Sequence, residues 1–152
     1  MKKNVITLVA ASIFLCGCGD VYKTYETYEI VKQGTDMFVD YIDAIGADWQ
    51  LSGTEGQPGC YVYQEFRFNE ITDAVLKDGA VLVYLVDDDG RDNILPYVFP
   101  VDNGYELIMQ NIRFDVEMGI LTLVIEWQDF NKYIQGNYKF KVCILQPGTD
   151  KK

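Results

Sequence analysis

The sequence predicts a mostly β protein, an antiparallel β-sandwich of the jelly-roll or immunoglobulin-like type with one short helix. From Asp36 onward, short runs of β-branched and aromatic residues alternate with turn residues. Two of the turns, Asp102-Asn103-Gly104 and Met118-Gly119, contain residues that tolerate the positive φ of tight hairpins. Because each hairpin must bury one face, a sandwich or barrel is the economical architecture.

The strands are expected in eight short segments. They are residues 37–43, 47–51, 60–68, 80–86, 94–99, 105–117 with an interruption, 120–127 and 138–145. The run 80–86 is apolar on both faces, which predicts a central strand covered on each side. The helix is expected at 72–78, with Thr72 as its N-terminal cap and Gly79 ending it in the left-handed conformation.

The N-terminus has the order of a bacterial export signal. Met1-Lys2-Lys3 precedes an apolar run, and Leu15-Cys16-Gly17-Cys18 resembles the lipobox that lipoprotein signal peptidase cleaves. This order predicts a signal peptide at 1–17, an acylated Cys18, a tether over 18–34, a sandwich domain at 35–148 and a tail at 149–152. Crossing a bilayer takes about 20 apolar residues, so a spanning helix is disfavoured, and an ordinary cleaved secretory signal is the other alternative.

Localisation follows from this segment. Gly19, rather than Asp, follows Cys18, so the enterobacterial cue for inner-membrane retention is missing. We expect a lipid-anchored protein of the outer membrane, facing the periplasm or the cell surface.

The charge of the chain bears on its partners. Loss of Lys2 and Lys3 with the signal leaves 11 basic against 23 acidic residues, a net charge of −12. An anionic nucleic acid would meet net repulsion, and no run of basic residues is present to release counterions from phosphates. The expected partners are therefore the membrane, through the lipid, and either a glycan or an envelope protein.

The residue inventory argues against catalysis. The chain has no histidine, and Ser52 is the only serine after cleavage, so triads of the Ser-His-Asp or Cys-His kind cannot be built. Carboxylates remain, and a glycosidase needs two of them about 5 to 10 Å apart. The carboxylates that are expected on strands and could converge are those of Glu65, Asp115, Glu117 and Glu126. The competing interpretation is that they face solvent separately.

Two segments are candidate ligand sites. The run 87–93 contains Asp87, Asp89 and Asp92, whose oxygens suit calcium, although the spacing is not that of an EF-hand and a hydrophilic turn is the plainer interpretation. The polar segment 128–137 contains Phe130, Asn131 and Tyr133, and rings beside amides suit a sugar. Trp127, in contrast, continues an apolar strand face and is expected in the core.

Two cysteines remain besides Cys18 and the lost Cys16. Cys60 and Cys143 could form one disulfide, which an exported compartment would permit. Alternation places Cys143 on the opposite face of its strand from Phe140 and Val142, which favours two separate thiols.

Residues 66–85, followed by Leu95-Pro96-Tyr97 and preceded by Asp48-Trp49, resemble small uncharacterised β-sandwich lipoproteins of Gram-negative gut bacteria. The resemblance covers about two-thirds of the mature chain. It implies a β-sandwich attached to the outer membrane, and it implies no activity.

These observations together predict a membrane-anchored lipoprotein whose domain acts in binding or in envelope structure without catalysis. The first alternative is a glycan-binding accessory module of a polysaccharide-uptake system. The second is an acid-based glycosidase.

Overall fold

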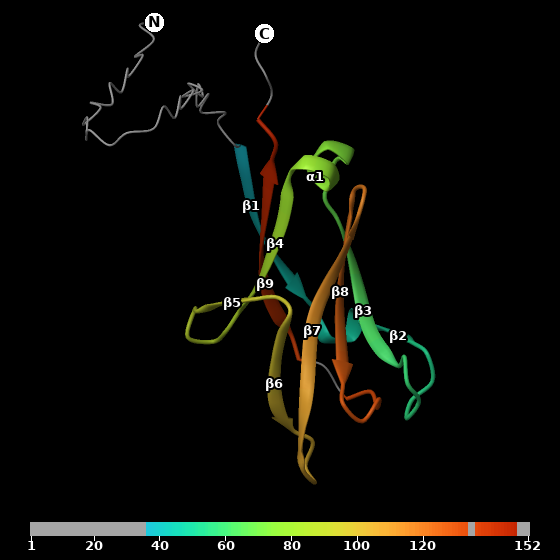
Figure 1. The fold of residues 1–152 in the computed structure, drawn as a ribbon. Coiled ribbons are helices and arrows are strands. Elements are labelled where there is room, and N and C mark those ends of the chain that lie inside the picture. Colours follow the sequence, from blue (N-terminus) through green and yellow to red (C-terminus); the bar gives the residue numbers. More distant parts are fainter. Residues whose placement is uncertain (1–35, 134–135, 149–152) are drawn as a thin grey trace, which may run out of the picture. The chain divides into compact units, whose positions relative to one another are not determined.

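Two antiparallel sheets, packed face to face, make up the fold (Figure 1). A computed structural model describes residues 36–133 and 136–148. The four-stranded sheet has the order β1 (Asp36–Ala44), β9 (Tyr138–Gln146), β4 (Ala80–Val86), β5 (Asp92–Ile94). The five-stranded sheet has the order β2 (Gln50–Ser52), β3 (Tyr61–Arg67), β8 (Ile120–Trp127), β7 (Leu107–Glu117), β6 (Tyr97–Asp102). The expected antiparallel β-sandwich is confirmed.

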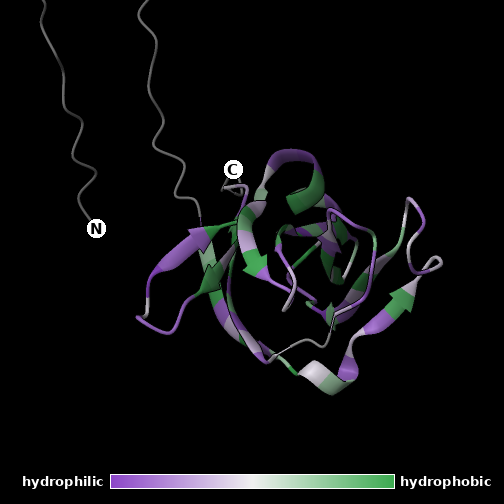
Figure 2. Ribbon diagram, turned by 90° about the horizontal axis from the view of Figure 1, so that it is seen from below, coloured by the Kyte–Doolittle hydropathy of each residue, from purple (hydrophilic) through white to green (hydrophobic). Residues whose placement is uncertain are grey.

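The core lies between the sheets and is built by alternation along the strands. Figure 2 views the domain from one end, with strands of both sheets around this interior. Its fully buried side chains include Val62, Ile112, Leu121, Leu123 and Ile125 from the five-stranded sheet and Val83, Phe140, Val142 and Ile144 from the other. Trp127 is also buried, as expected.

Three expected strands differ from the structure. The interruption expected within 105–117 is not seen, because β7 (Leu107–Glu117) runs without a break. Residues 46–48 form a short 3₁₀ helix, η1 (Gly46–Asp48), which leaves only β2 from the expected strand 47–51. The expected strand 94–99 is divided at Leu95-Pro96, whose peptide bond is cis, into β5 and β6 of different sheets. Proline has no N–H to give to a strand ladder, so the chain changes sheets where pairing is interrupted.

The expected helix is confirmed as α1 (Asp73–Asp78), at one end of the sandwich (Figure 1). The Thr72 hydroxyl accepts a hydrogen bond from the Val75 amide at 3.3 Å. Gly79 does not adopt the left-handed conformation, because its φ is −105°. Glycine is required there for space: a Cβ at this position would lie 2.3 Å from the Leu145 carbonyl oxygen.

The expectation that the strand at 80–86 is covered on both sides was wrong for one side. Its outward residues Leu82 and Tyr84 are half-buried beside β9, while Tyr41 and Ile94 on neighbouring strands are exposed. Lys141 lies 4.5 Å from the Tyr84 ring centroid, which supplies part of the cover. The aliphatic stem of lysine allows an outward apolar strand face to be shielded without a further layer.

Candidate functional site

The outer face of the five-stranded sheet carries a set of polar and aromatic side chains that neighbouring strands bring together. We call it the platform. Its members are the outward residues Tyr61, Tyr63 and Glu65 of β3, Asn111, Arg113, Asp115 and Glu117 of β7, and Thr122, Val124 and Glu126 of β8. They face outward because the residues alternating with them, such as Val62, Ile112 and Ile125, fill the core.

Antiparallel register sets the members of the platform in rows across the strands. Tyr63 pairs with Val124, which pairs with Arg113 on the far side. The valine is only 1% exposed although it faces away from the core. Side chains around Val124 therefore cover it and give the platform a packed base.

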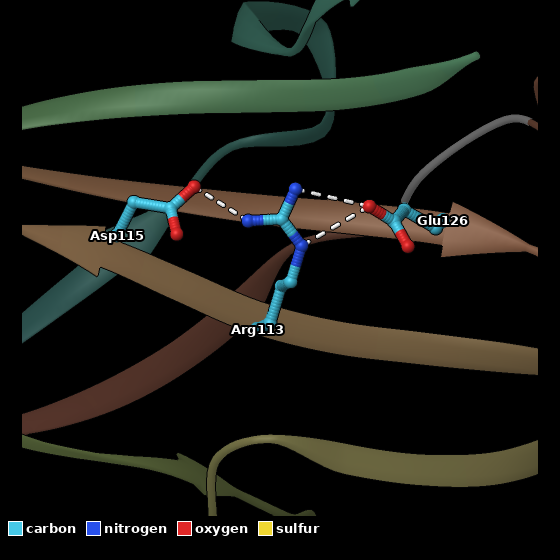
Figure 3. A network of polar contacts seen from close by, with 3 residues as sticks. All are labelled: Arg113, Asp115 and Glu126. Atoms are coloured by element: carbon cyan, nitrogen blue, oxygen red, sulfur yellow. Dashed lines mark hydrogen bonds and ion pairs between the residues drawn. The ribbon is translucent and has the colours of Figure 1, made fainter. Parts of the chain in front are cut away.

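Arg113 is the centre of the platform's charge network (Figure 3). Its Nε donates to Glu126 Oε1 at 3.0 Å, and one terminal nitrogen donates to Asp115 Oδ2 at 2.5 Å. Partial burial acts to lower the pKa of Arg113, but these two carboxylates outweigh it and raise the pKa above its ordinary value. The guanidinium is thus fixed between β7 and β8 with its charge balanced.

The tyrosines form the aromatic part of the platform. The rings of Tyr61 and Tyr63 pack edge to face with centroids 6.2 Å apart. Arg113 lies 5.9 Å from the Tyr61 ring centroid, and the Tyr63 hydroxyl donates to Gln50 Oε1 at 3.1 Å. These contacts hold two half-buried rings in fixed orientations, which lowers the entropy cost of stacking a ligand on them.

Two hollows border this aromatic and charged centre. The middle hollow has a volume of about 320 Å³ and is lined by Ser52, Tyr61, Tyr63, Glu65, Asp115, Glu117, Thr122 and Val124. The end pocket has a volume of about 330 Å³ and is lined by Gly59, Cys60, Met109, Asn111, Glu126, Trp127, Gln128 and Phe130.

Asn111, which lines the end pocket, has an unpaired polar atom. The side-chain oxygen of Asn111 is buried and has no hydrogen-bond partner in the described part of the chain. Cys60 is also buried, and desolvation together with the charge of Glu55 raises the pKa of its thiol. The thiol is therefore protonated at neutral pH, so the pocket presents acceptors and apolar surface rather than a nucleophile.

The carboxylates considered for glycosidase chemistry do share one face. Glu65 and Asp115 both pair with Thr122, from opposite sides. Two strand spacings separate their backbones by about 10 Å. The hollow between them is on the open face of the sheet, and Asp115 and Glu126 already bind Arg113.

The aromatic segment after β8 is organised around Asp129. Asn131 donates to this carboxylate through its backbone and side-chain nitrogens, at 3.2 and 3.1 Å, and Tyr133 donates its hydroxyl. Tyr133 also accepts from Asn103 and packs edge to face on Trp127, with centroids 5.6 Å apart. Asn131 and Tyr133 thus support the loop, whereas Phe130, 39% exposed, lines the end pocket.

The proposed calcium ligands are engaged with nitrogen groups of the protein. Asp87 accepts from the Arg91 amide at 2.7 Å, Asp89 pairs with the Arg91 guanidinium at 3.6 Å, and Asp92 pairs with Lys141. Within 36–133 and 136–148, no three acidic or sulfur side chains gather as a metal site. The geometry of this segment is that of a hydrogen-bonded turn between β4 and β5.

Cys60 and Cys143 are both free and buried, so the structure has the two separate thiols and not the disulfide. Cys60 precedes β3 of the five-stranded sheet, whereas Cys143 lies in β9 of the other sheet, between Val39 and Leu82. Their places on different sheets explain why they do not meet.

Cys18, the tether and the tail at 149–152 lie outside the described residues. Neither helix in the described part of the chain is long and apolar enough to cross a lipid bilayer. Comparisons with protein-family models, curated proteins and solved structures find no match for the chain. The class of protein is therefore defined by its own fold and surface: an antiparallel β-sandwich with an aromatic and charged outer face.

The carboxylates of the platform were expected from the sequence as candidate site residues. The four residues that were not expected are Tyr61, Tyr63, Arg113 and Asn111. The signal was present in β3, where Tyr61, Tyr63 and Glu65 alternate with Val62 and Phe66. Arg113 and Asn111 have the same alternation in β7. Only the pairing of β3, β8 and β7 as neighbours brings these residues to one place.

Proposed function

We propose that this protein is a lipid-anchored, non-catalytic binding module of the outer membrane that uses the platform as its binding surface. The acyl chain on Cys18 holds it at the membrane, and residues 18–34 space the sandwich from the bilayer. The observation that carries the proposal is the pair of hollows on either side of Tyr61, Tyr63 and the Arg113 network, all on one sheet face.

A glycan is the ligand that these groups suit best. Sugar C–H faces pack on aromatic rings, and sugar hydroxyls both donate to carboxylates and accept from a guanidinium. Tyr61 and Tyr63 supply rings, while Glu65, Asp115 and Arg113 supply the charged partners. A sheet face with hollows along its strands suits an extended polymer, and the role that follows is an accessory module of polysaccharide uptake.

Binding without catalysis is favoured over hydrolysis by the openness of the platform. A glycosidase strains its substrate and shields an acid and a base from water on opposite sides of one bond. Here Asp115 and Glu126 are bridged by Arg113 on the exposed sheet face. Their oxygens act in recognition and in fixing the guanidinium.

The test is binding of the mature chain to an array of microbial and plant glycans, with Tyr61→Ala compared with Tyr105→Ala. Tyr105 is 97% exposed, at the β6–β7 turn away from the platform, which makes it a matched aromatic control. We expect Tyr61→Ala to weaken binding by about tenfold, equivalent to about 1.4 kcal/mol, and Tyr105→Ala to leave affinity unchanged.

Three outcomes contradict the proposal. Equal losses of glycan affinity in Tyr61→Ala and Tyr105→Ala would show that the platform does not recognise the glycan. Release of shorter sugars by the wild type, abolished by Glu65→Gln, would make the protein a glycosidase. Absence of glycan binding, with capture of an envelope protein that Tyr61→Ala abolishes, would leave the platform as a protein contact.

A further inference from the structure

The end pocket is lined partly by residues beyond the platform. Met109 and Phe130, 40% and 39% exposed, bound it with apolar surface, and Trp127 and Cys60 lie at its base, each nearly fully buried. Phe130 is fixed by its backbone, which has a φ of 59° and whose carbonyl accepts from the Gly56 amide at 2.9 Å. The pocket is therefore a formed cavity whose walls do not depend on a ligand.

One polar atom of the residues that line it lacks a hydrogen-bond donor. The buried Asn111 oxygen has no partner, and leaving such an acceptor desolvated is costly unless a ligand or water supplies the hydrogen. Glu126, beside it in the register of β7 and β8, is a second acceptor whose Oε1 faces Arg113. The group that fits between these acceptors is an O–H or N–H.

Charge excludes anionic ligands. Glu126 lines the pocket, and Glu55 is close enough to Cys60 to raise the pKa of its thiol. The one arginine nearby, Arg113, is already bound by two carboxylates. An acidic sugar would thus meet Glu126, while the charge of Arg113 is already balanced.

The size of the end pocket suits a small occupant, such as one sugar ring. A volume of about 330 Å³ lies at the lower end of the range of about 300 to 1,000 Å³ in which small-molecule pockets fall. The middle hollow, on the other side of Tyr61, has room for further units of the same chain.

We propose that the end pocket is a subsite for one uncharged sugar ring, with a hydroxyl donating to Asn111 Oδ1 and the ring face against Phe130 and Met109. This inference rests on the proposed function, because it assigns the ligand class of one part of the platform. It adds a specificity: neutral hexose or pentose units bind, and uronic acids do not.

The experiment measures the affinity of the mature chain for maltohexaose, mannohexaose, xylohexaose and hexagalacturonate by calorimetry. The variant is Asn111→Leu, nearly isosteric, and its matched control is Asn69→Leu at an exposed position outside the platform. We expect Asn111→Leu to bind the neutral glycan with at least tenfold lower affinity. Its melting temperature should be equal to or above that of the wild type. Replacing an unpaired buried acceptor by an apolar group removes a desolvation cost. Asn69→Leu should leave the affinity unchanged.

A second variant keeps the inference falsifiable if Asn111→Leu folds poorly. Met109→Ala removes one apolar wall at a position already 40% exposed, and it should weaken binding of the same glycan several-fold. Wild-type affinity in Asn111→Leu and Met109→Ala, with loss in Tyr61→Ala, would overturn this subsite and leave the platform's function standing. Preferential binding of hexagalacturonate would overturn the charge argument, and no binding of any glycan would overturn both proposals.

Discussion

At the scale of single residues, Asp129 and Arg113 perform comparable tasks in different places. Each is a charged group that collects hydrogen bonds from its neighbours, Asp129 within the loop after β8 and Arg113 on the platform. Burial acts to raise the pKa of Asp129, but the hydrogen bonds from Tyr133 and Asn131 outweigh it and hold the pKa below its usual range. The loop that carries Phe130 to the end pocket is therefore stabilised by an ionised carboxylate.

The stability of this loop should depend on pH. A carboxyl group with a lowered folded-state pKa contributes stability above its unfolded pKa, near 4, and loses it as pH falls through the folded value. Asp129→Asn should therefore lower the free energy of unfolding at pH 7 by about 1.5 kcal/mol, the lower end of the usual range for hydrogen bonds to a charged group. Urea denaturation at pH 7 and below pH 3 measures this.

The exposed Asp88→Asn is the control for this measurement. We expect the difference between wild type and Asp129→Asn to shrink as pH falls from 4, while Asp88→Asn stays close to wild type throughout. A difference that is the same at both pH values would show that the carboxylate charge at Asp129 has no part in holding the loop.

At the scale of elements, the sequence predicts a turn or helix well when the residues that determine it are adjacent in the chain. The hairpin turns at 103–104 and 118–119 and the helix capped by Thr72 follow from residues adjacent in the chain, and the structure has all three. The division of 94–99 at Pro96 depends on which sheet each half joins, a long-range choice. The platform was only half predictable for the same reason, because β3 and β7 meet through β8.

Gly79 offers a test of element packing. The close approach of α1 to β9 leaves no room for a side chain, since a Cβ would lie 2.3 Å from Leu145 O and 2.9 Å from Val75 Cα. Gly79→Ala should lower the free energy of unfolding by about 1 to 3 kcal/mol, the usual cost of overpacking. Gly136→Ala, where nothing lies within 4 Å, is the matched control and should have little effect. Equal stability of the two variants in thermal denaturation would contradict the packing of α1 on β9.

At the scale of the whole molecule, the proposal joins a lipid anchor to a sandwich with one functional face. The outer faces of the two sheets differ in their hollows and exposed apolar residues: the four-stranded sheet exposes Met37, Val39 and Ile94, whereas the platform carries the middle hollow and the Arg113 network. The net charge of the chain is negative, so anionic ligands would be repelled. Uncharged ligands would not be repelled.

Lipidation is tested at Cys18. Cells fed a fatty-acid analogue should label the wild type, and Cys18→Ala should lose both the label and the association with membranes, because Cys18 is the acylated position of the predicted lipobox. Cys60→Ala is the control and should remain labelled. Labelling that persists in Cys18→Ala would contradict the anchor.

The most direct test of the account is a map of where the glycan binds. In ¹⁵N-labelled mature protein titrated with the glycan that gives the strongest array signal, amide shifts should change along β3, β7 and β8, with Tyr61, Asn111 and Arg113 among the largest. The Asp87–Asp92 turn and β1 should stay unchanged. Shifts confined to that turn or to the four-stranded sheet would contradict the assignment of the platform as the binding surface.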